Sequence, residues 1–162
     1  RFDALGKEYT YTFYLSKTRP VIERFQSHHV PQKLDIKAMQ TAADSFLGEH
    51  DFTALMDQGS PSPRPCRTLY SLILEEAGPF LHLRVIGDGF LYHMVRILAG
   101  TLLYVGLGKI AAADIPEMLR AGERRVMGPT LSASGLTLER VFYKEKLFGR
   151  DRWQYRDWQA ED

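Results

Sequence analysis

Residues 68–107 read TLYSLILEEAGPFLHLRVIGDGFLYHMVRILAGTLLYVGL, and this stretch decides the fold. Its first part predicts two strands, Thr68–Glu75 and Phe80–Ile86, because apolar side chains alternate in the second and a Gly-Pro turn separates the two. Gly87-Asp88-Gly89 then interrupts the strand pattern. From Phe90 to Leu107 the chain is apolar on nearly every side, which predicts a buried helix. An antiparallel hairpin followed by such a helix is typical of an α+β fold.

A membrane-spanning helix is the alternative interpretation of Phe90–Leu107. The segment is near the lower length limit for a bilayer span, and it contains His93, Arg96 and internal glycines. Charged side chains are costly inside a bilayer, so these residues favour a helix buried in protein. We therefore expect no membrane partner.

The remaining periodic segments complete the same fold class. Lys7–Ser16 alternates, with its aromatic side chains mostly on one face, and predicts a half-buried strand. Asp35 and Gly48 are expected to cap an amphipathic helix between them. Asp114–Ala121 predicts a short helix and Gly135–Tyr143 a last strand. The sequence thus predicts an α+β fold, with a mostly antiparallel, mixed sheet and helices packed on one face.

The domain organisation is simple. Loops are expected from Arg19 past Pro31 and over residues 59–65, and the segments beside the second loop are too small to bury separate cores. We predict one domain over residues 1–143 and a charged, aromatic tail over residues 144–162. The chain begins without Met, so we expect it to be part of a longer protein.

Composition narrows the class of protein. Among the 162 residues, 44% are hydrophobic and 25% charged, which is typical of a globular domain and not of a disordered chain. The single cysteine, Cys66, cannot form an internal disulfide, and no Cys/His cluster has zinc-ligand spacing. A reducing, cytoplasmic location fits this. The net charge of +1 neither indicates nor excludes a nucleic-acid partner.

Arg96 is the strongest chemical clue, because it stands in the middle of an apolar helix. An unpaired buried guanidinium costs several kcal/mol, so it needs an anionic partner. No acid follows closely on the same helix, and Asp88 precedes it at some distance. Arg96 is therefore either a structural or snorkelling residue, or an active-site arginine beside a carboxylate or phosphate.

Three further residues are candidates. His93 lies three positions before Arg96 and is expected on the same helix face, where a hydrogen-bonded core histidine is the commoner case. Tyr9 either packs on the sheet or, near the strand end, provides a stacking platform for an RNA base. Lys7, two residues before Tyr9, could contact a phosphate.

Several separate segments resemble segments of the tRNA pseudouridine synthase A family, and they follow one another in the same order as in that family. The two longest are GFLYHMVRILAGTLL at residues 89–103, continued by VGLGK at 105–109, and GPTLSASGL at 128–136. Shorter matches, in chain order, are Arg1–Ala4, Lys7–Tyr11, His50–Phe52, Cys66–Thr68 and Val141–Tyr143.

The resemblance implies a reaction and a set of roles. Members of this family isomerise uridine to pseudouridine in the anticodon stem-loop of tRNA, with an aspartate nucleophile and no cofactor or metal. Tyr9 matches the tyrosine that stacks on the target base, and Arg96 matches the basic residue that pairs with the aspartate. Lys7 and His93 would be supporting residues. The family also implies a homodimer in the full-length protein.

This sequence departs from the family pattern at one segment, the one that carries the catalytic aspartate. The family's aspartate lies in a Gly-Arg-Thr-Asp-Ala-Gly-Val-His segment, and this sequence has none. We therefore predict the C-terminal, catalytic-half portion of a synthase, inactive by itself. The alternatives are an RNA-binding module without enzymatic activity and a protein-interaction domain without a role on RNA.

Overall fold

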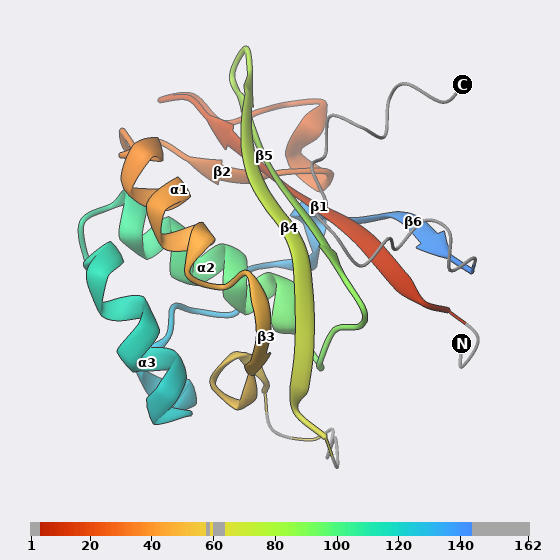
Figure 1. Cartoon of the computed structure of the whole chain (residues 1–162). Helices are drawn as coiled ribbons and strands as arrows, with labels where there is room; N and C mark the ends of the chain where they lie inside the picture. Colours follow the sequence, from red (N-terminus) through yellow and green to blue (C-terminus); the bar gives the residue numbers. More distant parts are fainter. Residues whose placement is uncertain (1–3, 58, 60–63, 144–162) are drawn as a thin grey trace.

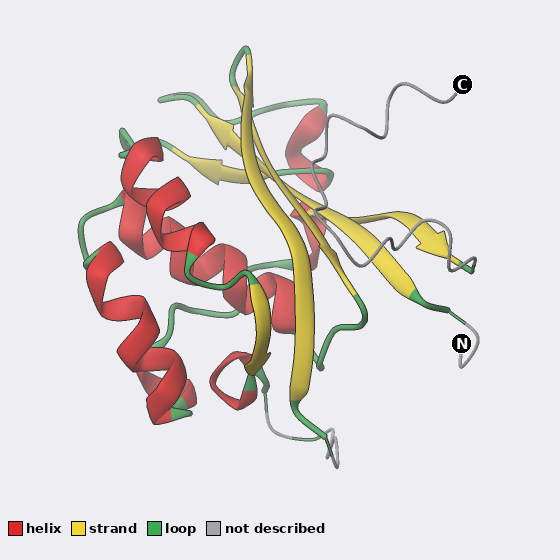
Figure 2. Cartoon of the chain, viewed as in Figure 1, coloured by secondary structure: helices red, strands yellow, loops and turns green. Residues whose placement is uncertain are grey.

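A computed structural model of the chain describes residues 4–57, 59 and 64–143. Within this part, the chain forms a six-stranded mixed sheet with three α-helices (Figure 1). The three α-helices lie together on one side of the strands (Figure 2). The predicted α+β class, with a mixed sheet and helices on one face, is confirmed.

The sheet has the order β2-β1-β5-β4-β3, and β6 also pairs with β1. The strands are β1 Gly6–Leu15, β2 His28–Val30, β3 Gly48–Asp51, β4 Cys66–Ala77, β5 Phe80–Gly87 and β6 Leu136–Phe142. The helices are α1 Ile36–Asp44, α2 Met94–Gly106 and α3 Ile115–Ala121. Only the β1–β2 pair is parallel among the strand pairs of the described residues.

The sequence prediction missed two strands. β2 lies inside the segment that was predicted to be a loop, and β3 begins at the glycine that was predicted to cap the preceding helix. α1 instead ends at Asp44, and Gly48 has a φ of +92° at the start of β3. Both strands have four residues or fewer, so they are too short to show alternation. Asp35 does cap α1, because its side chain accepts a hydrogen bond from the Ala38 N–H at 2.9 Å.

The second correction concerns the start of the buried helix. α2 begins at Met94 and not at Phe90, because His93 has a φ of +60° in the left-handed region. His93 is the N-cap residue, so the expectation that it shares a helix face with Arg96 is wrong. A left-handed conformation costs a residue with a Cβ about 1–2 kcal/mol, which the contacts of His93 must offset.

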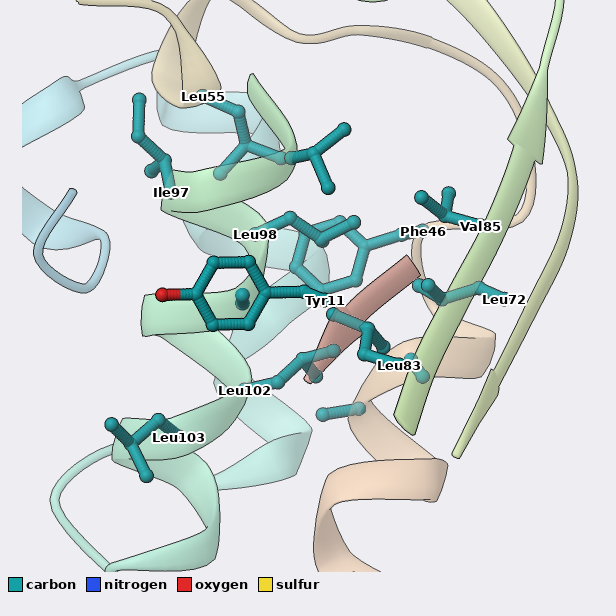
Figure 3. Close-up of a cluster of buried hydrophobic side chains, with 14 of the residues drawn as sticks. Tyr11, Phe46, Leu55, Leu72, Leu83, Val85, Ile97, Leu98, Leu102 and Leu103 are labelled. Carbon is teal, nitrogen blue, oxygen red and sulfur yellow. The ribbon is translucent and has the colours of Figure 1, made fainter. Parts of the chain in front are cut away.

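Tyr11 joins β1 to the helical layer. Its ring is fully buried in the cluster that contains Leu98 and Leu102 of α2 (Figure 3), and its hydroxyl donates to the Ser132 carbonyl at 2.8 Å. Burial raises the pKa of Tyr11 to about 12, although the Ser132 hydrogen bond and the charge of Arg96 lower it in part. The segment around Ser132 is thus anchored beside the start of α2.

Residues 128–129 pack backbone to backbone on α2. A Cβ added to Gly100 would lie 1.9 Å from the Pro129 carbonyl oxygen, and one added to Gly128 would lie 2.4 Å from the Gly100 carbonyl. The Gly128 N–H donates to the Thr101 hydroxyl at 3.0 Å in the same contact. Both glycines are needed because the two backbones leave no room for a side chain.

Gly100→Ala is expected to destabilise the protein by about 2–3 kcal/mol, since rigid backbone must move to admit a methyl group. For a chain of this size, that corresponds to a fall in melting temperature of about 4–12 °C. Gly106→Ala is the comparison in the same helix and should cost less, because there the new Cβ meets side-chain atoms of Met39 and Leu34 and not backbone. Calorimetry on both variants checks this. Equal melting temperatures for Gly100→Ala and Gly106→Ala would contradict the prediction.

The division into a domain at 1–143 and a tail at 144–162 stays a prediction, because the tail lies outside the described residues. Among the helices of the described part, none is long and apolar enough to cross a membrane.

Candidate nucleic-acid and active site

Tyr9 lies on the face of β1 that the helices cover. It pairs with Val85 of β5, and its ring meets the edge of Phe90, which follows β5, with centroids 5.2 Å apart and an interplanar angle of 87°. Tyr9 is partly buried, and no hydrogen bond to its hydroxyl is made by the part of the chain that the structure describes. The ring is therefore held from one side while its polar end is available to a ligand.

Lys7 and Arg67 line a pocket beside this aromatic pair. The pocket has a volume of about 460 Å³, and Phe90 and Asp88 also line it. Asp88 is fixed in its turn, because its carboxylate accepts from the Thr68 N–H at 3.0 Å. Two cations and an aromatic ring around one hollow fit an RNA backbone and base. Sequence reasoning identified Lys7 but missed Arg67 and Phe90.

Arg96 lies in the first turn of α2, so the expectation of a buried arginine in the middle of this helix is wrong. Its Nε donates to the Leu131 carbonyl at 2.5 Å, and the Leu131 N–H donates to the Arg96 carbonyl at 3.4 Å. The side chain is partly exposed, and none of the described carboxylates lies within the 4.0 Å ion-pair distance of it. The described part of the chain therefore orients this guanidinium without neutralising it.

Four side chains from three segments meet beside the start of α2, and we call them the Asp57 cluster: Asp57, His93, Arg124 and Thr130. Asp57 accepts hydrogen bonds from Arg124 Nε and His93 Nδ1, each at 2.9 Å, and from the Thr130 hydroxyl at 2.8 Å. Arg124 also donates to the Thr130 hydroxyl at 2.8 Å and to the Gly128 carbonyl at 2.9 Å.

The electrostatics of the cluster favour an ionised Asp57. Partial burial alone would raise the pKa of its carboxyl group. The hydrogen bonds from its three partners and the charge of Arg124 outweigh this and lower the pKa to about 2. Asp57 is therefore a carboxylate at neutral pH.

His93 is held at one edge and at one face of its imidazole ring. Nδ1 donates to Asp57, and the Tyr92 ring stacks on the imidazole with centroids 3.8 Å apart. These contacts offset the strain of its left-handed backbone. The hydrogen bond expected of a core histidine is present, but the His93 side chain is partly exposed and not part of the core. Its partner Asp57 was not recognised from the sequence.

The described residues hold no group of three or more His, Cys, Asp or Glu side chains placed to bind a metal ion. The comparison with protein families gives a match to the tRNA pseudouridine synthase model over residues 42–144, which is more than half of the chain. The chain belongs to the tRNA pseudouridine synthase family. The resemblance read from the sequence is thereby confirmed, and a family of isomerases is established for the chain.

Relatives of the tRNA pseudouridine synthase family match almost all of this chain but only part of their own length. The protein named tRNA pseudouridine synthase A of Acetivibrio thermocellus is 43% identical over 143 residues, which is 88% of this chain and 59% of that relative. The protein of the same name from Geobacter sp. strain M21 is 42% identical over 146 residues, with 90% and 59% covered. The Bacillus subtilis strain 168 protein is 40% identical, with 88% and 58% covered. The chain therefore spans less than two thirds of these relatives.

Proposed function

We propose that this chain is the C-terminal, catalytic-half portion of a tRNA pseudouridine synthase. The enzyme isomerises uridine to pseudouridine in the anticodon stem-loop of tRNA, acts as a homodimer in the cytoplasm and needs neither cofactor nor metal. One observation carries the proposal beyond family membership. Arg96 is oriented by the Leu131 carbonyl at the start of α2, yet it has no acidic partner within the described residues. This is the arrangement expected where a second segment supplies the carboxylate.

In this reaction the chain's residues bind and orient, while the nucleophile comes from elsewhere. The bond between ribose and the uracil nitrogen breaks, the base turns and a bond from ribose to a ring carbon forms. That carbon loses its proton and the released nitrogen gains one, so the product is an isomer of uridine. Tyr9 stacks on the target base, with Phe90 supporting its ring. Arg96 holds the nucleophilic aspartate ionised and in place by a charge-assisted pair. Lys7 contacts a neighbouring phosphate at the pocket beside Tyr9.

The chain alone is expected to be inactive, because the Gly-Arg-Thr-Asp segment is missing from its sequence. Tritium release from tRNA labelled at uracil C5 measures the reaction directly. We expect release by the full-length protein that carries this sequence and none above background by residues 1–162.

Two outcomes would contradict the proposal in different ways. Turnover by residues 1–162 would show that one of their own aspartates serves as the nucleophile. Absence of turnover by the full-length protein on anticodon stem-loop uridines, despite tRNA binding, would instead favour an RNA-binding module without enzymatic activity.

A further inference from the structure

The Asp57 cluster links three segments that sequence separates widely. Asp57 precedes β4, His93 caps α2, and Thr130 belongs to the segment that packs on α2. One carboxylate accepts a hydrogen bond from each of the two flanking segments and a third from Arg124. Removing its charge would therefore loosen several contacts at once.

The first link to Arg96 runs through His93. His93 alone among the described non-glycine residues has a positive φ, and α2 begins directly after it. Arg96 follows only three residues later. Without the Asp57 hydrogen bond, the left-handed conformation at His93 loses its anchor, and the first turn of α2 is free to shift.

The second link runs through Thr130. The Thr130 hydroxyl donates to Asp57 and accepts from Arg124, and the next residue, Leu131, accepts the hydrogen bond from Arg96. The carbonyl that orients the guanidinium thus lies one residue from a side chain fixed by Asp57. Both links end at the same group.

We propose that Asp57 is a positioning residue of the proposed synthase, which fixes the Arg96 guanidinium through His93 and through Thr130–Leu131. Asp57 does not touch the uridine. Its carboxylate holds the two segments between which Arg96 is placed, so that Arg96 meets the nucleophilic aspartate in a single geometry. This inference rests on the proposed function of Arg96 and adds a residue to it.

The test uses the full-length protein and measures the single-turnover rate at saturating tRNA, the tRNA affinity and the melting temperature separately. Asp57→Asn is expected to lower the rate about 10–100-fold and to change the affinity less than about threefold, because small misplacements of a catalytic group cost rate rather than binding. Glu123→Gln is the matched control. It neutralises the acid of an acid–arginine pair in the segment that contains Arg124, with Glu123 Oε2 at 2.6 Å from Arg125 Nε, and should leave the rate unchanged.

Three further variants keep the test decisive if Asp57→Asn folds poorly. Thr130→Val keeps the side-chain shape but removes the hydroxyl, and should lower the rate in the same direction by a smaller factor. His93→Asn keeps a donor for Asp57 and suits the left-handed conformation, so its rate should exceed that of His93→Ala by about tenfold. Equal rates for these two histidine variants would contradict the link through His93.

A double-mutant cycle separates positioning from general destabilisation. If Asp57 acts through Arg96, Asp57→Asn should add little to the loss already caused by Arg96→Lys. Full additivity, or a wild-type rate for Asp57→Asn, would overturn the proposal while leaving the synthase activity established by the wild-type control. No activity in the wild-type protein would instead contradict the proposed function itself.

Discussion

Arg96→Ala in the full-length protein is expected to slow pseudouridine formation about 10²–10³-fold. Removing one member of an enclosed ion pair costs about 3–5 kcal/mol, and the partial exposure of Arg96 places the effect toward the lower end. The loss should fall on the single-turnover rate, because the nucleophilic aspartate loses its partner while the surface that binds tRNA remains. Single-turnover kinetics at saturating tRNA measure it.

Two variants accompany this measurement. Arg96→Lys keeps the charge but not the fork that the Leu131 carbonyl orients, so its rate should lie between those of Arg96→Ala and the wild type. Arg120→Ala is the control, because Arg120 is an exposed arginine at the end of α3. If Arg96→Ala retains the wild-type rate, Arg96 is a structural residue that orders the Leu131 segment.

Tyr9→Phe should keep the stacking ring and remove the hydroxyl, whereas Tyr9→Leu removes both. With the hydroxyl in proton transfer, Tyr9→Phe is expected to cut the rate about 10²–10⁴-fold with little loss of affinity. Tyr9→Leu should in addition weaken tRNA binding about tenfold, because base stacking contributes about 1–3 kcal/mol. Single-turnover rate, tRNA affinity and melting temperature are measured for both variants.

Tyr14→Phe is the matched control for the hydroxyl. Tyr14 lies on the same strand as Tyr9 but packs on Phe80, with ring centroids 5.4 Å apart, far along β1 from the start of α2. A silent Tyr9→Phe together with a Tyr9→Leu that lowers only the melting temperature would show a packing role. Unchanged rate and affinity in both variants would remove Tyr9 from the site.

Several features could be predicted from short segments of sequence. Alternation placed Tyr9 and Tyr11 on one face of β1, and the run of apolar residues identified α2 as a buried helix. Arg96 was recognised as a candidate because it is a charged residue in an apolar segment that contains no acid to pair with it. Each of these predictions needs only residues that are neighbours in the chain, whose periodicity directly reflects burial.

Other features could not be predicted because they depend on where the sheet places distant segments. β2 and β3 are short strands whose formation depends on backbone pairing with β1 and β4. Phe90 and Arg67 join Tyr9 and Lys7 only because the ends of β1, β4 and β5 meet. No spacing rule connects these residues.

The sequence by itself determined the α+β class and the family, and it singled out Arg96, whose anionic partner stays a prediction. Only the tertiary structure decided that His93 is a left-handed N-cap residue and that Asp57 joins it to Arg124 and Thr130. The physical reason is the range of the interactions. Hydrophobic periodicity can be recognised in consecutive residues. The Asp57 carboxylate instead accepts hydrogen bonds from residues that lie 36 to 73 positions away along the chain.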